Sequence, residues 1–561
     1  MKKRSKERTR VSAPVVAPLW RECVLLAVVV LLLCGIYLGK AYNIDDPLTV
    51  WTAQRVAEHP ADFYGFDVNW YGALEPMFRI DLNPPGAAYY LAPFGILFNW
   101  HESAAHIAIA FSAAALILGV YFLARRMNGH PLTAAVFALV CPGVFVSMGT
   151  VMTDMPMTAL WVWAIVLWMA GLENERPVIN AAAGVLIGLA VLVKYFALSL
   201  VPLLFVYTLF SVRKRRIVWL LIPVAILGLF ELYTRHLYGT GHIQIIAGLA
   251  EQYHSATTVN YGRKFLTGLT FIGAGAAPAL FLAPWLWRRR KIFWIGAAAA
   301  ALVTVILKQS GWQPGETQIS FGWGFWIQYG IWLLAGVHIV VLAAVELWTR
   351  RDRDAILFSL WLGGTFFYFV FIYHLVNIRV ILPALPVAAL LCARRLNSVW
   401  TEIRQKNECF VRAAVVRSAL AVSLALSLCV AWADISLANS ARTAAEKIAP
   451  EKRSGRVWFS GHWGFQYYME ARGAKPIDVK HQDFKLGDTV VTPLNATNVF
   501  LPRPRVASTD QSFELPVCRW LTTMRAERGA GFHADLWGPL PFVFGAVPDE
   551  RYQMLVIGNV P

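Results

Sequence analysis

The sequence predicts a polytopic α-helical membrane protein with a small C-terminal domain outside the membrane. Of its 561 residues, 57% are hydrophobic and 15% are charged, whereas about 25% of the residues of a soluble domain are charged. Apolar segments such as residues 23–38, 105–124 and 331–345 recur along most of the chain, and about 20 apolar residues can span a bilayer as a helix. The last part of the chain lacks such segments and should fold in water.

A hydropathy window of about 19 residues yields about thirteen spans, the last near residues 414–431. We therefore expect a basic arm at residues 1–21, a membrane domain at residues 22–432 and a C-terminal domain at residues 433–561. The apolar run after Cys23 continues without a small-residue cleavage site, so the first span should be retained. Because the number of spans is odd, the termini should lie on opposite sides of the membrane.

The basic residues indicate which side is cytoplasmic. Clusters of Lys and Arg recur between spans, as is typical of cytoplasmic loops; they lie at residues 2–10, 125–126, 213–216, 288–291, 350–353 and 394–395. The N-terminus should therefore be cytoplasmic. Anionic lipid headgroups beside these loops explain the net charge of +17, which accordingly does not predict nucleic-acid binding.

The extracytoplasmic side should hold two long loops, residues 41–103 and 234–265, together with the C-terminal domain. Loops of this length in a compact protein are usually functional, and the first should form short helical pieces. In the C-terminal domain, runs such as residues 457–460, 489–491 and 554–557 alternate with turn residues. This alternation predicts a small α/β or β-rich fold.

Neither a disulfide framework nor a structural metal site is expected. Of the seven cysteines, only Cys518 falls in a predicted outer segment, and one cysteine cannot form a framework. The sequence contains no CxxC pair and no HExxH helix, the spacings that predict a structural zinc site.

Three aspartates stand out at the outer ends of spans. Asp45 and Asp46 lie a few residues after the first span, and Asp154 lies in a tight outer turn between the third and fourth spans. Taken singly, each is explained equally well as a helix N-cap or a solvated loop residue. A carboxylate is costly near the apolar zone, by up to about 3 kcal/mol at a helix centre. Three carboxylates at the same membrane level therefore indicate a functional site.

Five short motifs follow one another along the predicted membrane domain. They are Ile44-Asp45-Asp46-Pro47, Asn83-Pro84-Pro85-Gly86 before Tyr89-Tyr90, Thr153-Asp154-Met155-Pro156, Val191-Leu192-Val193-Lys194-Tyr195 and Asn377-Ile378-Arg379. In this order the chain resembles the protein O-mannosyltransferase-like members of the GT-C glycosyltransferases, relatives of the bacterial aminoarabinose transferase. The resemblance implies a GT-C type fold in a bacterial inner membrane and a sugar donor carried on polyprenyl phosphate.

The resemblance also implies roles for individual acids and for one lysine. Asp45 matches the carboxylate usually assigned as catalytic, Asp46 stands where a second acid is common, and Asp154 matches the acid of the second outer turn. Lys194 matches a lysine that the family often keeps between the fifth and sixth spans. Snorkelling of Lys194 to the headgroup level is the alternative explanation.

A substrate-binding loop is implied around the double proline. It comprises Asn83, Pro84, Pro85 and Tyr89. The sequence departs from the family at Asn83, because many members have Lys or His there to contact the phosphate. Arg79, four residues earlier, is the nearest substitute.

The implied reaction suits these residue types. A sugar linked through phosphate has an anionic leaving group, so the site needs cations rather than an acid; the candidates are Lys194, Arg379, Arg79 and His374. The acceptor hydroxyl must lose a proton as it attacks, and we expect Asp45 to be the base. A single in-line displacement would invert the anomeric centre, and Asp46 and Asp154 would then either orient the acceptor or support the site.

The expected partners are a polyprenyl-phosphate sugar, an acceptor that is a lipid, glycan or protein, and membrane lipids. The sequence implies no definite cofactor, although carboxylates near a phosphate can hold a divalent cation. The sequence leaves that alternative open.

A membrane transporter or lipid flippase is the main alternative function, since it would share the hydropathy and the basic loops. Such proteins usually carry ionisable residues near mid-membrane and broken helices in corresponding halves. The predicted spans are nearly free of acids away from their ends, His338 is the clearest ionisable exception, and no internal repeat is visible.

Overall fold

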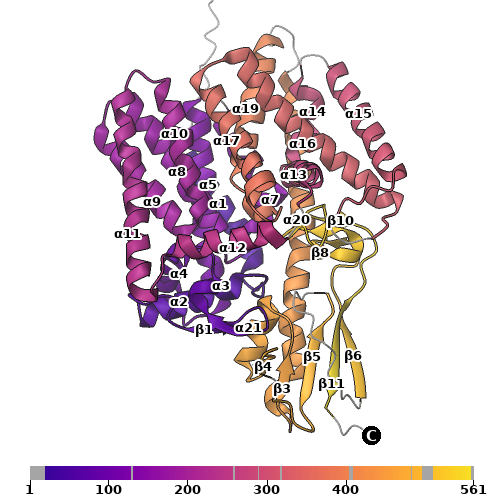
Figure 1. Ribbon diagram of the computed structural model, residues 1–561. Helices are drawn as coiled ribbons and strands as arrows, with labels where there is room; N and C mark the ends of the chain where they lie inside the picture. Colours follow the sequence, from indigo (N-terminus) through magenta and orange to yellow (C-terminus); the bar gives the residue numbers. More distant parts are fainter. Residues whose placement is uncertain are drawn as a thin grey trace, which may run out of the picture.

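The protein consists of a large helical bundle and a smaller C-terminal region that contains a sheet (Figure 1). The computed structural model describes residues 19–127, 130–256, 259–287, 290–315, 319–403, 409–481, 483–495 and 509–557. The predicted basic arm of residues 2–10 lies outside the described residues.

Within the described residues, eight helices are long and apolar enough to cross a membrane. They involve α1 (Leu19–Cys34), α5 (Glu102–Arg126), α8 (Asp154–Glu173), α11 (Leu221–Tyr238), α15 (Arg290–Gln309), α16 (Trp323–Arg350), α17 (Arg353–Phe367) and α20 (Cys409–Ile448). The helices α13 (Tyr261–Gly275) and α14 (Pro278–Leu286), bent by 89° at their junction, form a possible ninth span. The predicted polytopic helical fold is confirmed, whereas the count of about thirteen spans remains a prediction.

Shorter helices complete the bundle. They are α6 (Pro131–Leu139), α7 (Pro142–Ser147), α9 (Pro177–Val193), α10 (Leu200–Leu209), α18 (Ile378–Ile381) and α19 (Ala384–Ile403). A proline stands at the start of α6, α7, α9 and α14, where its missing N–H removes no helical hydrogen bond.

Small residues allow α13 and α16 to approach closely. A Cβ atom on Gly273 would lie 2.0 Å from the carbonyl oxygen of Trp332, and one on Gly336 would lie 1.9 Å from the carbonyl oxygen of Leu269. Helix backbones in membranes approach this closely only where a side chain is absent or small. The two glycines therefore fix the packing of α13, which leads towards the bent junction with α14.

The basic loops gather at one end of the bundle. At the C-terminal end of α8, Glu173 pairs with Arg126 at 2.6 Å and with Arg353 at 3.8 Å, while Asp352 pairs with Arg394 at 2.6 Å. Asp154 begins α8 and Glu173 ends it, and the 20 residues of this helix correspond to a length of about 30 Å. The basic loops and Asp154 therefore lie at opposite ends of the bundle, and the side that faces the cytoplasm remains a prediction.

The predicted loop 41–103 consists mainly of regular elements at the end of the bundle that carries Asp154. They are α2 (Asp46–Glu58), β1 (Asp67–Asn69), β2 (Leu74–Pro76), α3 (Met77–Ile80) and α4 (Gly86–Leu97). The strands β1 and β2 pair antiparallel. The helix α12 (His242–Ala256), within the second predicted outer loop, lies near α3 and α4 (Figure 1).

The helix α20 runs out of the bundle into the C-terminal region (Figure 1), so the boundary predicted at 432/433 falls inside it. The sheet has the order β4-β3-β5-β11-β6, with β3 (Val457–Phe459), β4 (Lys475–Pro476), β5 (Thr489–Pro493), β6 (Thr509–Leu515) and β11 (Glu550–Val556). The strands β4, β3 and β5 are parallel, and β11 is antiparallel to β5 and β6. The helix α21 (Trp463–Ala471) connects β3 to β4. The predicted small α/β fold is confirmed.

Two further strand pairs lie in the connection between β6 and β11. They are β7 (Leu521–Thr522) with β10 (Val543–Phe544), and β8 (Met524–Arg525) with β9 (Ala530–Gly531). The loop after β9 packs against the bundle, because the Ile378 N–H donates to the carbonyl oxygen of Phe532 at 3.0 Å.

Candidate active site

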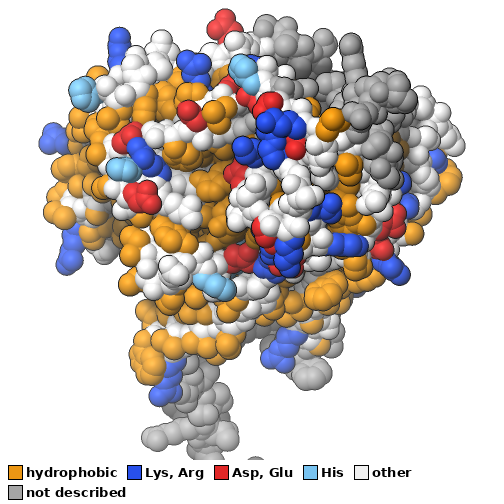
Figure 2. Space-filling view, turned by 90° about the horizontal axis from the view of Figure 1, so that it is seen from below, with side chains coloured by type: hydrophobic (Ala, Val, Ile, Leu, Met, Phe, Trp, Pro, Cys, Tyr) orange, Lys and Arg blue, Asp and Glu red, His pale blue; other side chains and the backbone are white. Residues whose placement is uncertain are grey.

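A cavity of about 200 Å³ lies where the first outer segment, the segment before α18 and the C-terminal region meet. Its charged and polar lining includes Asp45, Tyr71, Asp81, Asn83, His374, Arg379 and His533. Figure 2 shows the molecule from below, and on this face acidic and basic side chains lie beside one another among hydrophobic ones. A cavity that combines carboxylates with a guanidinium suits a substrate that carries both hydroxyl and anionic groups.

A chain of ion pairs joins four of the predicted site residues. Arg379 donates from Nη1 to Asp45 Oδ2 at 2.5 Å and from Nε to Asp154 Oδ2 at 2.9 Å. Lys194 Nζ pairs with the other oxygen of Asp154. The Asp154 side chain is 1% exposed and that of Asp45 is 33% exposed. Of these two acids, Asp45 is the one that lines the cavity, whereas Asp154 holds two cations.

Local structure explains why Asp45 is available. Asp45 occupies the N-cap position of α2, with Pro47 in the first turn, yet its side chain makes no capping hydrogen bond. The carboxylate instead pairs with Arg379 across 334 residues of sequence. The alternative explanation of Asp45 as an ordinary N-cap therefore does not account for its side chain.

The position of Arg379 depends on its own helix and on the C-terminal region. Asn377 caps α18 by accepting the N–H of Val380 at 2.9 Å. On the preceding turn, the Val376 N–H donates to Asp535 Oδ1 at 3.0 Å, and the Asp535 N–H returns a bond to the Val376 carbonyl at 3.0 Å. The short helix that carries Arg379 is therefore fixed at its start by bonds to the C-terminal region.

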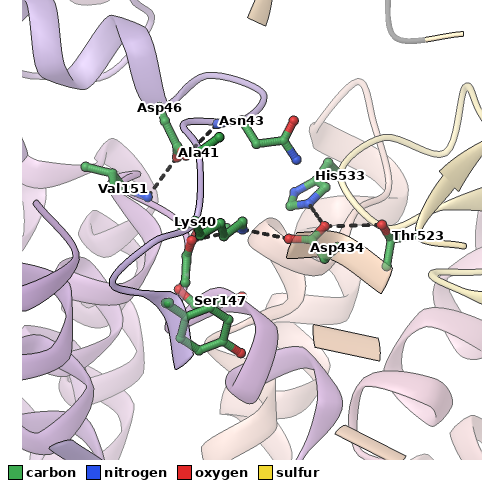
Figure 3. A network of polar contacts seen from close by, with 12 residues as sticks. Lys40, Ala41, Asn43, Asp46, Ser147, Val151, Asp434, Thr523 and His533 are labelled. Atoms are coloured by element: carbon green, nitrogen blue, oxygen red, sulfur yellow. Dashed lines mark hydrogen bonds and ion pairs between the residues drawn. The ribbon is translucent and has the colours of Figure 1, made fainter. Parts of the chain in front are cut away.

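Asp46, the neighbour of Asp45, has a different environment (Figure 3). Its oxygens accept the backbone N–H groups of Asn43 at 2.8 Å and Val151 at 2.7 Å, and its side chain is fully buried. Burial raises the pKa of Asp46 to about 7. Asp46 joins the first outer segment to the turn before Asp154 and does not line the cavity, so its catalytic assignment remains a prediction.

The remaining predicted residues fall into two groups. Asn83 and His374 line the cavity, and the backbone N–H of Asn83 donates to Asp81 Oδ1 at 3.0 Å. Four others do not line it: Arg79 is exposed, Pro84 and Pro85 are buried at the start of α4, and the Tyr89 hydroxyl donates to the carbonyl oxygen of Pro60.

Asp81 is a cavity residue that the sequence analysis missed. It lines the cavity beside Asn83, and burial, reinforced by the nearby charge of Asp45, raises its pKa to about 6. Its position two residues before Asn83, in a segment already singled out, was the available signal.

The C-terminal region contributes further cavity residues. Trp463, His533 and Trp537 line the cavity together with Asp45, although about 400 residues or more separate them from it. Only the packing of the C-terminal region on the bundle brings them together.

The described residues contain no group of three or more His, Cys, Asp or Glu side chains that could hold a metal ion. Near the cavity, Asp45 and Asp154 are both paired with Arg379. Each of these two acids is therefore already engaged by a cationic side chain.

Residues 82–233 match the family model of dolichyl-phosphate-mannose-protein mannosyltransferases. The resemblance to the GT-C glycosyltransferases is confirmed. This region carries Asn83, Asp154 and Lys194 of the GT-C-like chain, and thus part of the ion-pair chain at the cavity. No curated protein matches the sequence.

Solved structures similar to the GT-C-like chain include three glycosyltransferases. The oligosaccharyltransferase of Archaeoglobus fulgidus is 15% identical, with 81% of this chain and 64% of that one covered and a TM-score of 0.47. ArnT of Cupriavidus metallidurans bound to undecaprenyl phosphate is 17% identical, with 85% and 94% covered and a TM-score of 0.40. The arabinofuranosyltransferase AftD from Mycobacteria is 14% identical, with 97% and 40% covered and a TM-score of 0.42. The chain thus spans less than two thirds of the length of the archaeal enzyme.

Proposed function

We propose that the chain is a glycosyltransferase that moves a sugar from a polyprenyl-phosphate donor to a lipid, glycan or protein acceptor outside the cytoplasm. The observation that carries this proposal is the chain of ion pairs Asp45–Arg379–Asp154–Lys194 at the wall of the cavity. It combines a reachable carboxylate with cations, which is the combination that glycosyl transfer from a phosphate requires.

Arg379 is proposed to bind the donor phosphate and to stabilise the negative charge that develops on it. A guanidinium can bond two phosphate oxygens at once, and Arg379 lines the cavity. The buried carboxylate of Asp154 keeps Arg379 and Lys194 near each other, so the positive charge is in place before the reaction begins. In this proposal Asp154 positions the cations, rather than the acceptor.

Asp45 is proposed to be the general base. As the acceptor oxygen forms its bond to the anomeric carbon, the bond from that carbon to the phosphate oxygen breaks and inverts the centre. The hydroxyl proton passes to Asp45, and the electron pair leaves with the phosphate, which Arg379 neutralises. Asp45 is the more exposed of the two acids paired with Arg379, which supports this choice.

The location of the cavity supports entry of the donor from the bilayer of a bacterial inner membrane. The cavity lies at the end of the bundle opposite the basic loops, which is the predicted extracytoplasmic end. A prenyl chain between the helices would leave its sugar phosphate at that level, beside Arg379.

Transfer assays with matched variants test the proposal. Membranes that contain equal amounts of the wild type, Asp45→Asn or Asp67→Asn would be supplied with labelled sugars on polyprenyl phosphate. Asp67 is an exposed acid of the same outer segment outside the cavity, so Asp67→Asn controls for loss of an outer charge. We expect transfer by the wild type and Asp67→Asn but not by Asp45→Asn.

Either of two results would overturn part of this assignment. Equal transfer by all three proteins would remove Asp45 as the base. No transfer by any of them, accompanied by movement of the labelled lipid between leaflets, would instead support the flippase alternative.

A further inference from the structure

The C-terminal region supplies an aromatic wall to the cavity. Trp463, at the start of α21, and Trp537, in the loop before β10, both line it, with ring centroids 5.1 Å apart and planes inclined by 53°. Trp537 is only half-buried. Aromatic faces in a cavity that also contains a reachable carboxylate and a guanidinium are suited to a ligand with both apolar and hydroxylated surfaces.

The backbone holds Trp463 in an uncommon conformation. Its φ is +66°, a left-handed value that a bulky residue adopts only when its surroundings enforce it. The next residue is pressed against the first outer segment, since a Cβ on Gly464 would lie 1.8 Å from the carbonyl oxygen of Tyr42. This contact fixes Trp463 close to the segment that carries Asp45.

A buried polar network fixes a third cavity residue, His533 (Figure 3). Its Nε2 lies 3.0 Å from Asp434 Oδ1, and Asp434 also bonds Lys40 Nζ at 2.7 Å and Thr523 Oγ1 at 3.2 Å. The side chains of His533, Asp434 and Lys40 are at most 1% exposed. The imidazole therefore has a fixed orientation.

One nitrogen of His533 is left for another partner. Nδ1 of this buried ring has no hydrogen-bond partner among the described residues. Because a carboxylate only accepts hydrogen bonds, Nε2 must carry the proton that faces Asp434, and in the tautomer with a proton on Nε2 alone Nδ1 presents a lone pair. A hydroxyl group is the simplest donor to satisfy it.

We propose that Trp463, Trp537 and His533 form a carbohydrate subsite contributed by the C-terminal region. The C–H face of a sugar ring packs on the tryptophan rings, whose faces carry partial negative charge, and one sugar hydroxyl donates to His533 Nδ1. The proposal rests on the proposed glycosyl transfer and identifies which residues recognise the sugar. The ring belongs either to the donor or to a glycan acceptor, and the two sources share this chemistry.

Binding measurements on the purified full chain test the subsite. The probes are undecaprenyl phosphate alone and undecaprenyl phosphate carrying mannose, glucose or aminoarabinose, and the variants are Trp537→Ala, Trp537→Phe and His533→Gln. The control is Trp520→Ala, because Trp520 is an exposed tryptophan of the same region outside the cavity. Acceptor KM is measured in transfer assays with the preferred donor.

For a donor-sugar subsite, Trp537→Ala should weaken binding of the sugar-loaded carrier about tenfold and leave the bare carrier unaffected. For an acceptor-sugar subsite, donor binding should stay constant while the acceptor KM rises by a similar factor. In either case Trp537→Phe should behave nearly as the wild type does, because it keeps an aromatic ring. His533→Gln should change the same quantity as Trp537→Ala, either donor affinity or acceptor KM.

Two outcomes would contradict the subsite in distinguishable ways. Unchanged donor binding and unchanged acceptor KM in Trp537→Ala and His533→Gln, with active wild type, would overturn the subsite alone. A wild type that binds neither loaded nor bare carrier and transfers no sugar would overturn the proposed function, and the subsite with it. If Trp537→Ala does not fold, His533→Gln, which nearly preserves side-chain volume, decides the question.

Discussion

Two adjacent acids at the start of α2 illustrate how residues of the same type acquire different roles. Asp45 faces the cavity and pairs with Arg379, whereas Asp46 accepts two backbone N–H groups and is fully buried. In the proposed reaction Asp45 accepts a proton from the acceptor, whereas Asp46 joins two segments of backbone. At this scale the two acids should respond differently to substitution.

Replacing Asp46 by alanine should destabilise the protein by about 2–6 kcal/mol. The change leaves the buried N–H groups of Asn43 and Val151 without acceptors, and an unsatisfied buried donor costs about 1–3 kcal/mol. The thermal unfolding midpoint of the purified protein in detergent measures this loss. Asp45→Asn serves as the comparison, because it should abolish transfer with a much smaller change in midpoint. Equal midpoints for Asp46→Ala and the wild type would contradict the structural role.

Arg379 should not be replaceable by lysine. Arg379 bonds Asp45 and Asp154 from two different nitrogens, and a single ammonium group cannot reproduce this fork. We expect Arg379→Lys to lower kcat about 100-fold, as for loss of one preorganised donor. Arg472→Lys, at an exposed ion pair with Glu451, is the matched control. A rate for Arg379→Lys within threefold of the control would exclude the proposed role.

Asp81 should make donor binding sensitive to pH. Its pKa is raised to about 6 by burial, so the side chain is neutral below about pH 6 and negative above it. A negative Asp81 repels the donor phosphate in the same cavity, so the donor KM should rise, by up to about tenfold, from pH 5 to pH 7.5. Asp81→Asn should remove this rise and keep KM low throughout. A pH profile identical in the variant would refute the assignment.

At the scale of elements, three distant parts of the chain meet at Asp434. Lys40, just after α1, and His533, in the loop after β9, both bond this residue of α20, and Lys40 also donates to the carbonyl oxygen of Gly149 at 2.9 Å. The network therefore joins the first helix, the turn before Asp154 and the C-terminal region in one buried junction.

Removal of one charge from this junction should destabilise the protein more than is expected when both charges are replaced by apolar side chains. Lys40→Met leaves a buried carboxylate that has lost its cation, so we expect destabilisation by about 3–5 kcal/mol. Lys40→Met combined with Asp434→Leu should be less destabilising than the sum of the single changes, by about 2 kcal/mol. Unfolding midpoints of the three variants and the wild type measure the difference. Strict additivity would show that the two charges are not coupled.

At the scale of the whole molecule, sequence reasoning succeeded where the signal was local or repeated. Apolar segments predicted the helices, and the ordered motifs selected Asp45, Asp154, Lys194 and Arg379, which the fold brings into one chain of ion pairs. The difference between Asp45 and Asp46 was not predictable, because it depends on the backbone of Val151, which is about a hundred residues away.

The aromatic wall was beyond sequence reasoning for the same physical reason. The sequence does not indicate which residues Trp463 and Trp537 contact. The rules of hydropathy explain tryptophan in a membrane protein as an interfacial anchor. The two tryptophans lie near Asp45 because α20 carries the chain out of the bundle and the C-terminal region then packs on the bundle. Long-range packing of this kind is absent from any local pattern.

The basic end of the bundle predicts the sidedness of the molecule. Arg351 is exposed at the end with the basic loops, and Asp67 is exposed in the first outer segment. In intact cells, a membrane-impermeant maleimide should label Asp67→Cys, and it should label Arg351→Cys only after the membrane is opened. The wild type provides the background, because six of its seven cysteines are buried or partly buried.

The labelling result also constrains the enzyme assignment. If Arg351→Cys were labelled in intact cells and Asp67→Cys were protected, the cavity would face the cytoplasm. Nucleotide-activated sugars are available there, and the reason to expect a lipid-linked donor would be lost. If the expected pattern is found, the cavity faces a compartment that lacks such sugars, and the donor must arrive attached to a lipid. Sidedness is thus the physical fact on which the polyprenyl-phosphate donor depends.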